Sequence, residues 1–389
     1  MNVGIDAISF YSSNYFLDLK TLGAVRGVDP AKYYVGIGQE KMAIPPPDED
    51  IVTMGANAAL PILQREGKDR IEMLLFATES GIDQSKAAGV FVHGLLQLPA
   101  RCRTVELKEA CFSGTAALQL AAAWVKSHPQ SRVLVVAADV ARYELGSPGE
   151  PTQGCGAVAM LITANPRLLA LDDEVGMYTE DVMDFWRPNY RDQALVDGKY
   201  STRVYLQSLQ TCWQQYREQS GRDVADIHRY CYHLPFTRIA EKAHERLLKA
   251  SGVNLSDDQL EAQIAGSLGY NKLTGNSYAA SLYVGLTCLL DTTAEDLAGK
   301  RIGLFSYGSG CVAEYFSAVV QPGYRSHLFA AQHQALLDGR TELSYRQYED
   351  IYNLVFPTDG GQHTFSRYRT GPFRFAGVNQ HKRLYEAAS

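Results

Sequence analysis

The sequence predicts a layered α/β fold made of two similar halves. Apolar runs of strand length alternate with segments of helical periodicity along most of the chain, which is typical of a sheet covered by helices. A short motif recurs, because GCGAVA at 154–159 is followed by GSGCVA 154 residues later. No long linker rich in Pro, Gly or Ser separates the halves, so we expect them to pack as one body.

The first half is expected to span residues 1–170. Short apolar, β-branched runs predict its strands, and apolar residues at helical spacing predict its helices. Strands are expected at 3–10, 71–77, 103–107, 132–138 and 156–163, with helices at 51–65, 84–96 and 115–126.

The second half is expected to span residues 171–389, and it resumes the alternation after the loop-rich passage MDFWRPNY. Ser256 and Gln259 predict a capping box at the start of a helix. No element is assigned to the segment 357–375, which is rich in Gly, Arg and aromatic residues. Helices are expected at 203–218, 237–250 and 278–290, with strands at 227–232, 301–306 and 311–320.

Composition limits the partners and the compartment. The net charge of −6 disfavours nucleic acid or an anionic membrane as the main partner. The N-terminus lacks a basic region, Asp6 interrupts its apolar run, and no apolar run reaches roughly 18 residues. Seven cysteines without C-x-x-C spacing suggest neither a disulfide framework nor a zinc site. We therefore expect a reduced, cytoplasmic protein.

Cys111 lies between an extended run and a helical pattern, in the stretch ACFSGTAAL. Backbone N–H groups and the macrodipole at a helix N-terminus favour a thiolate, and this predicts a nucleophile with a lowered pKa. The small residues Ser113 and Gly114 are expected to leave space for a substrate and to let backbone amides face an oxyanion. Position alone does not set aside the more common case, an ordinary buried cysteine that behaves as a small hydrophobic residue.

Three further residues are candidate partners of this cysteine. Glu79 ends an apolar strand pattern, where a carboxyl group either has a raised pKa suited to acid–base work or pairs with a cation. His233 ends the comparable pattern 154 residues later, a place where a structural histidine is also common. Asn276, in TGNSY, would by itself be a helix cap.

Seven segments together resemble the bacterial type of 3-hydroxy-3-methylglutaryl-CoA synthase, a branch of the thiolase superfamily. The resemblance lies in their order and spacing and runs from residue 1 to about residue 350. It implies a thiolase-like fold with αβαβα layers and a homodimer. The segments are ATES, ELKEACFSGTAAL, GEPTQGCGAVAM, DFWRPN, YHLPF, TGNSYAASLY and FSYGSG.

The resemblance also implies roles for individual residues. Cys111 would accept an acetyl group, Glu79 would be the general acid–base, and His233 would position the second substrate. The implied reaction condenses acetyl-CoA with acetoacetyl-CoA to give HMG-CoA and CoA, a step of the mevalonate pathway, with both thioesters as substrates and no cofactor or metal. Substrate-binding positions of the family fall on Thr152, Ser201, Lys242, Asn276 and Ser309.

Departures from the family pattern leave alternatives open. Phe112 and Ser113 stand where the family usually has Tyr and then Gly or Ala, and Cys155 replaces a usual alanine. ACFSGTA also resembles relatives that act on an acetoacetyl-acyl carrier protein in polyketide β-branching, whereas GEPTQGCGAVAM and DFWRPNY favour CoA. A ketoacyl synthase would not require Glu79. A non-catalytic acyl-CoA binding protein would usually have lost one of the three catalytic residue types.

Overall fold

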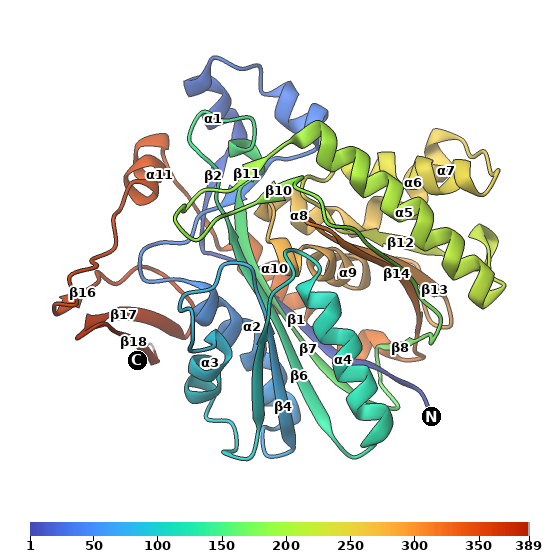
Figure 1. Ribbon diagram of the computed structural model, residues 1–389, viewed down its shortest axis with the longest axis horizontal. Coiled ribbons are helices and arrows are strands. Elements are labelled where there is room, and N and C mark those ends of the chain that lie inside the picture. Colours follow the sequence, from blue (N-terminus) through green and yellow to red (C-terminus); the bar gives the residue numbers. More distant parts are fainter. Residues whose placement is uncertain (388–389) are drawn as a thin grey trace.

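The computed structural model describes residues 1–387, and its centre is a mixed sheet of ten strands (Figure 1). The strand order is β12-β13-β14-β8-β1-β7-β6-β4-β5, with β9 paired to β14. The short strand β8 pairs with β1 on one side and β14 on the other, which joins the two halves. These strands are β1 (Val3–Tyr11), β4 (Ile71–Ala77), β5 (Arg103–Leu107), β6 (Arg132–Ala141), β7 (Gly154–Ala164), β8 (Leu169–Leu171), β9 (Gly176–Thr179), β12 (Arg229–Tyr232), β13 (Arg301–Gly308) and β14 (Val312–Val320).

The two halves share one topology. Strand β4 is parallel to β6, which is antiparallel to β7. In the same way β12 is parallel to β13, which is antiparallel to β14. Helix α4 (Ser113–Ser127) precedes β6 as α9 (Ser281–Thr292) precedes β13. This correspondence confirms the expected pair of similar α/β halves.

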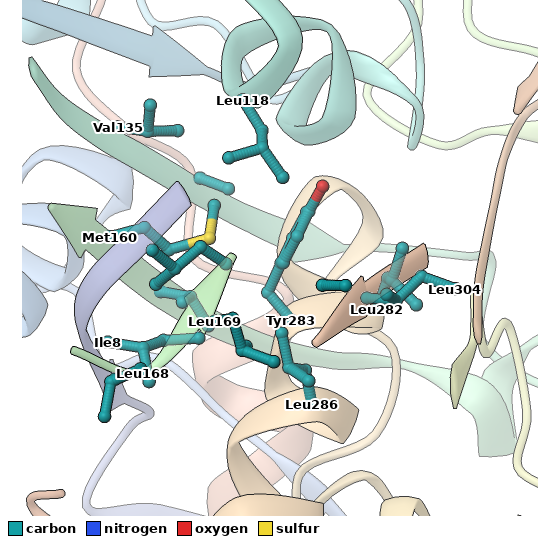
Figure 2. Packing of buried hydrophobic residues seen from close by; sticks show 14 of the residues in the cluster. Ile8, Leu118, Val135, Met160, Leu168, Leu169, Leu282, Tyr283, Leu286 and Leu304 are labelled. Carbon is teal, nitrogen blue, oxygen red and sulfur yellow. The ribbon is translucent and has the colours of Figure 1, made fainter. Parts of the chain in front are cut away.

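Helices α4 and α9 form the middle layer between the two parts of the sheet. Figure 2 shows Leu118 of α4 and Tyr283 and Leu286 of α9 lying between Met160 of β7 and Leu304 of β13, all within one buried cluster. Helices α2 (Ile51–Glu66) and α3 (Ala88–Leu96) cover the outer face of the first half. Helices α5 (Gly198–Ser220) and α6 (Ile239–Ala250) cover that of the second. The layers are therefore αβαβα, as expected.

Local side-chain hydrogen bonds set several helix ends. The predicted capping box of Ser256 and Gln259 is confirmed at the start of α7 (Asp257–Ile264). The helix expected from residue 84 begins only at Ala88. The reason is that the Asp83 carboxylate accepts hydrogen bonds from the N–H groups of the next residues, which holds a turn in place of a helical one. The expected helix at 278 starts as a 3₁₀ turn, Tyr278–Ala280.

The remaining elements surround the layered core. The previously unassigned tail includes a hairpin that packs on α2, where Arg383 and Tyr385 contact Asp50. Among residues 1–387, no helix is long and apolar enough to cross a membrane. Residues 388 and 389 of the expected second half lie outside the described part. The further elements are β2 (Tyr15–Asp18), α1 (Leu19–Arg26), β3 (Lys41–Ala43), β10 (Phe185–Trp186), β11 (Leu195–Val196), α8 (Gly269–Thr274), α10 (Ala330–Asp338), β15 (Thr341–Glu342), α11 (Tyr345–Tyr352), β16 (His363–Thr364), β17 (Phe373–Asn379) and β18 (Lys382–Ala387).

Candidate active site

Cys111 lies on a sharp turn between β5 and α4. Ala110 has a φ of +43°, a left-handed conformation that is uncommon for a residue with a side chain. Strand β13 packs closely against this turn, because a Cβ atom on Gly308 would lie 2.7 Å from the backbone nitrogen of Phe112. The turn is thus held from the second half of the molecule, and Cys111 is only partly buried.

Glu79 and Cys111 are in direct contact. The Cys111 thiol donates a hydrogen bond to Oε1 of Glu79 at 3.1 Å. Strands β4 and β5 are parallel neighbours and end side by side, with Ala77 paired to Leu107. Because both residues follow the carboxyl ends of these strands, they emerge at the same edge of the sheet.

The surroundings of Glu79 and Cys111 favour the protonated form of both side chains. Burial, followed by the charge of Asp139, raises the pKa of the Glu79 carboxyl well above its usual range. Burial, followed by Glu79, also raises the pKa of the Cys111 thiol. The expected low pKa of Cys111 is therefore wrong: desolvation and nearby carboxylates outweigh the backbone dipoles. Oε1 of Glu79 is the acceptor of the hydrogen bond that this thiol donates.

Ser113 and Gly114 are small for packing reasons. Ser113 is buried, and its hydroxyl donates to the carbonyl of Ala110 at 2.9 Å. A Cβ atom on Gly114 would lie 2.6 Å from the carbonyl oxygen of Ala279. The expectation that these two residues leave space for a substrate is wrong, because Ser113 is fully buried and the main chain before α9 fills the space beside Gly114. Cys155 is likewise a core residue, buried on β7.

Sequence reasoning missed Asp139, a buried carboxylate near the end of β6. Its Oδ1 accepts hydrogen bonds from the backbone N–H groups of Glu79 and Ser80, both at 2.9 Å, and from the Thr78 hydroxyl at 2.7 Å. Its Oδ2 accepts from the N–H of Ala279 at 3.0 Å. The available signal was an acidic residue inside the apolar run RVLVVAADVA.

His233 follows β12 directly and is buried. Its backbone N–H donates to Phe305, and its carbonyl accepts from the Tyr205 hydroxyl at 2.9 Å. Burial lowers the pKa of His233 to about 3, so the ring is neutral at physiological pH. Among the described residues, Nδ1 of His233 has no hydrogen-bond partner.

The structure brings Thr152 of the first half to Asn276 of the second. The N–H of Asn276 donates to the carbonyl of Thr152 at 3.1 Å. Oδ1 of Asn276 accepts from the N–H of Tyr278 at 2.8 Å, but the N-cap of the 3₁₀ turn that begins there is Ser277, so Asn276 is not the helix cap that the sequence suggested. The ring of Phe185 contacts the rings of Tyr278 and Tyr143. Burial raises the pKa of both tyrosines, and both are close enough for the charge of Cys111 to act on them.

Asp184 is a second carboxylate that sequence reasoning missed. It accepts hydrogen bonds from α5, from β13 and from the turn after β13. Its Oδ2 accepts from the hydroxyls of Ser201 at 2.8 Å and Tyr307 at 2.6 Å, and its Oδ1 accepts from the N–H of Gly310 at 2.9 Å. Ser309, half-buried, stands between the last two of these residues in the chain. The sequence did not single out Asp184, because this residue lies in a polar segment with the composition of a loop.

Lys242 is not brought to the other candidates. It is exposed on α6 and forms no ion pair with any residue that the structure describes. Within residues 1–387, no group of three or more His, Cys, Asp and Glu side chains is placed to hold a metal ion.

Comparison with known proteins assigns the chain to one family, with family models that match most of residues 1–357. The family model for the hydroxymethylglutaryl-coenzyme A synthase N terminal matches residues 1–167, and that for the C terminal matches 169–251 and 239–357. A hydroxymethylglutaryl-CoA synthase from Enterococcus faecalis is 46% identical over 360 residues, which cover 92% of this chain and 94% of that protein.

Two further proteins show the breadth of the family. The polyketide biosynthesis 3-hydroxy-3-methylglutaryl-ACP synthase PksG from Bacillus subtilis is 34% identical over 373 residues, covering 90% of this chain and 88% of that protein. A crystal structure of HMG-CoA synthase complexed with CoA superposes with a TM-score of 0.94 at 41% identity, over all of both chains. The chain therefore belongs to the hydroxymethylglutaryl-CoA synthase family of acyl-condensing enzymes.

Proposed function

We propose that this enzyme condenses acetyl-CoA with acetoacetyl-CoA and water to give 3-hydroxy-3-methylglutaryl-CoA and CoA, through an acetyl group on Cys111. In the cell this would be a step of the mevalonate route to isoprenoids. The observation that carries the proposal is the 3.1 Å hydrogen bond between the Cys111 thiol and Glu79. One carboxyl group in contact with the nucleophile can serve every proton transfer of the reaction.

In the first step the sulfur of Cys111 attacks the thioester carbonyl of acetyl-CoA. The thiol proton passes to the Glu79 carboxylate as the new carbon–sulfur bond forms, and CoA leaves with a proton. The raised pKa of Glu79 supports this role, because a base whose pKa lies near that of the group it serves transfers protons in both directions.

In the second step Glu79, again ionised, removes a proton from the acetyl methyl group. The resulting carbanion adds to the ketone of acetoacetyl-CoA, and the new alkoxide takes up the proton that Glu79 removed. Water then hydrolyses the thioester to Cys111, which frees the product and the thiol. His233, neutral at physiological pH, is proposed to donate a hydrogen bond to the acceptor's carbonyl oxygen.

The substrate-binding roles stay proposals, with different degrees of structural support. Thr152 and Asn276 are joined by a backbone hydrogen bond, the Ser201 hydroxyl donates to Asp184, and Ser309 precedes Gly310, whose N–H also donates to Asp184. Lys242 is exposed and unpaired among the described residues, which suits a cation for a phosphate group of CoA. We also propose that the first half supplies the nucleophile and base, and the second half supplies His233 and Asn276.

The acceptor is proposed to be bound to CoA. The 46% identity to the CoA-named relative, against 34% to the ACP-named one, supports this choice. The test offers acetoacetyl-CoA and an acetoacetyl-acyl carrier protein in competition and compares the two kcat/KM values. A higher value for acetoacetyl-CoA is expected. A higher value for the carrier-bound acceptor would make polyketide β-branching the function.

We further propose a cytoplasmic homodimer. Strand β5 is an edge strand of the sheet with Val105 40% exposed, and an open edge of this kind is suited to pairing with a second copy. A thiol nucleophile works best where cysteines stay reduced. Light scattering during size-exclusion chromatography tests the oligomer, with a mass of twice 42.9 kDa expected and a monomer mass contradicting it.

A further inference from the structure

Arg187 reaches the active site from the ribbon formed by β10 and β11. The ribbon closes where the N–H of Asp197 donates to the carbonyl of Asp184 at 3.0 Å. Arg187 directly follows β10, and its Nη2 donates a hydrogen bond to the main-chain carbonyl oxygen of Glu79. The N–H of Glu79 is held at the same time by Asp139. Both polar groups of the Glu79 backbone are therefore fixed by side chains.

Arg187 is also the positive charge that faces a mainly acidic site. Asp139 of β6 and Glu109 of the turn before Cys111 both disfavour the ionised form of Glu79, as does burial. The charge of Arg187 favours it. The charge of Asp184, which precedes β10, disfavours the ionised form of Cys111. Tyr143 and Tyr278 lie at the same site, and burial keeps both in the protonated phenol form.

The two contacts combine a mechanical and an electrostatic effect in one side chain. The hydrogen bond to a carbonyl fixes the direction in which the Glu79 side chain leaves the backbone, and so its approach to Cys111. The charge acts on the carboxyl group itself. A neutral residue of similar length would retain part of the hydrogen bonding to the Glu79 carbonyl, but it would lose the electrostatic effect on the carboxyl group.

We propose that Arg187 is a positioning residue, which fixes the Glu79 main chain and supports the ionised carboxylate that the reaction uses. This inference rests on the proposed function, because it matters only if Glu79 acts as the base. It also makes the position of the ribbon important for the reaction, because Arg187 is part of the ribbon. Displacement of the ribbon would remove the cation from Glu79 and leave the carboxyl group protonated.

The test compares Arg187→Gln and Arg187→Lys with the wild type across pH 6 to 10, measuring kcat/KM for acetoacetyl-CoA. Arg187→Gln removes the charge, so the acidic limb of its profile should move to higher pH by about one pH unit. Its activity at pH 7 should fall about tenfold and recover toward the wild-type value at the alkaline end. Arg187→Lys keeps the charge, and its limb should stay near that of the wild type.

Arg191→Gln is the matched control. Arg191 is exposed in the loop of the same ribbon and its side chain forms no bond with the described residues, so the same substitution removes the same charge without touching Glu79. Its profile should match the wild type. A loss in Arg187→Gln that is equal at every pH, or an unshifted profile, would overturn the inference.

Failure of the proposed function would look different. If the wild type neither acquires an acetyl group from acetyl-CoA nor condenses it, the proposed function fails and no pH profile exists. If the wild type does both and Arg187→Gln keeps the wild-type profile, only the inference about Arg187 fails. Thermal melting of each variant shows that the proteins compared are folded.

Discussion

The carboxylate of Asp139 accepts a hydrogen bond from the backbone N–H of Ala279 at 3.0 Å, across the two halves of the molecule. The other oxygen of Asp139 accepts from the N–H of Glu79. One buried side chain therefore fixes the segment that carries Glu79, the proposed base, relative to the segment that follows Asn276. This geometry links the stability of the interface between the halves to the order of the active site.

Asp139→Asn should weaken both stability and activity. The amide has one oxygen in place of two, so at least one buried N–H group loses its acceptor and faces an NH₂ group. The loss should lower the free energy of unfolding by about 1–3 kcal/mol. Activity should fall more than tenfold, because the Glu79 backbone is no longer fixed. Urea unfolding and steady-state kinetics measure the two effects, and an unchanged unfolding midpoint would contradict this account.

Gly114→Ala should destabilise the fold, because the added Cβ atom would meet the Ala279 carbonyl at 2.6 Å. The cost should be about 1–3 kcal/mol, together with a lower kcat, since α4 must move with Cys111. Gly94→Ala in α3 is the matched control. Nothing lies within 4 Å of a Cβ atom there, so the melting temperature should hold or rise. Equal melting temperatures for the two variants would refute the close contact.

Glu79→Gln should abolish condensation while Cys111 can still be acetylated. The amide cannot remove the methyl proton, so product formation should fall by about 10²–10⁴-fold. Acetylation should be slower, because the thiol loses its proton acceptor, but it should reach one acetyl group per chain. Product assays and intact-protein mass measurement follow the two steps. Retained condensation would instead favour a ketoacyl synthase, which obtains its carbanion by decarboxylation.

Glu49→Gln should remove a pH dependence of stability. Burial raises the pKa of Glu49 from 4.5 to about 7 in the folded chain. Below pH 4.5 the group is protonated whether the chain is folded or not, whereas above pH 7 the folded state carries a buried charge. Wild-type stability should therefore fall between these pH values relative to the variant, by up to about 3 kcal/mol.

Melting temperatures of the wild type and Glu49→Gln at pH 5 and pH 8 measure this difference. The hydrogen bond from the Tyr11 hydroxyl to Glu49, 2.7 Å long, can be kept by the amide oxygen. Glu342→Gln, at an exposed position, is the control and should give the wild-type pattern. The prediction fails if the Glu49→Gln and wild-type curves stay parallel over this range.

Sequence patterns predicted the elements whose signal is local. The strands expected at 71–77 and 103–107 are β4 and β5 at the same boundaries. The first is the largely apolar run IEMLLFA, and the second is the mixed segment RTVEL. The contact between Glu79 and Cys111 follows from these two strands lying side by side. The predicted start of the helix at 84–96 was wrong, because the turn at Asp83 competes with helical hydrogen bonding and the helix begins at Ala88.

Properties that depend on distant residues were beyond sequence reasoning. The pKa of Cys111 is raised by burial first, then by Glu79, and further by Asp139 and Asp184, which are 28 and 73 residues further along the chain. Gly114 was interpreted as space for a substrate because its neighbour Ala279 is remote in sequence. In both cases the local pattern was correctly located, but its physical meaning depended on residues that are distant in the sequence.

The most direct test of the central claim is the intact mass of the protein after incubation with acetyl-CoA alone. The wild type should gain one acetyl group, on the peptide that contains Cys111, and lose it when acetoacetyl-CoA is added as product appears. Cys111→Ala should gain nothing. An adduct that persists in Cys111→Ala, or product formation by that variant, would contradict a mechanism in which this sulfur carries the acetyl group.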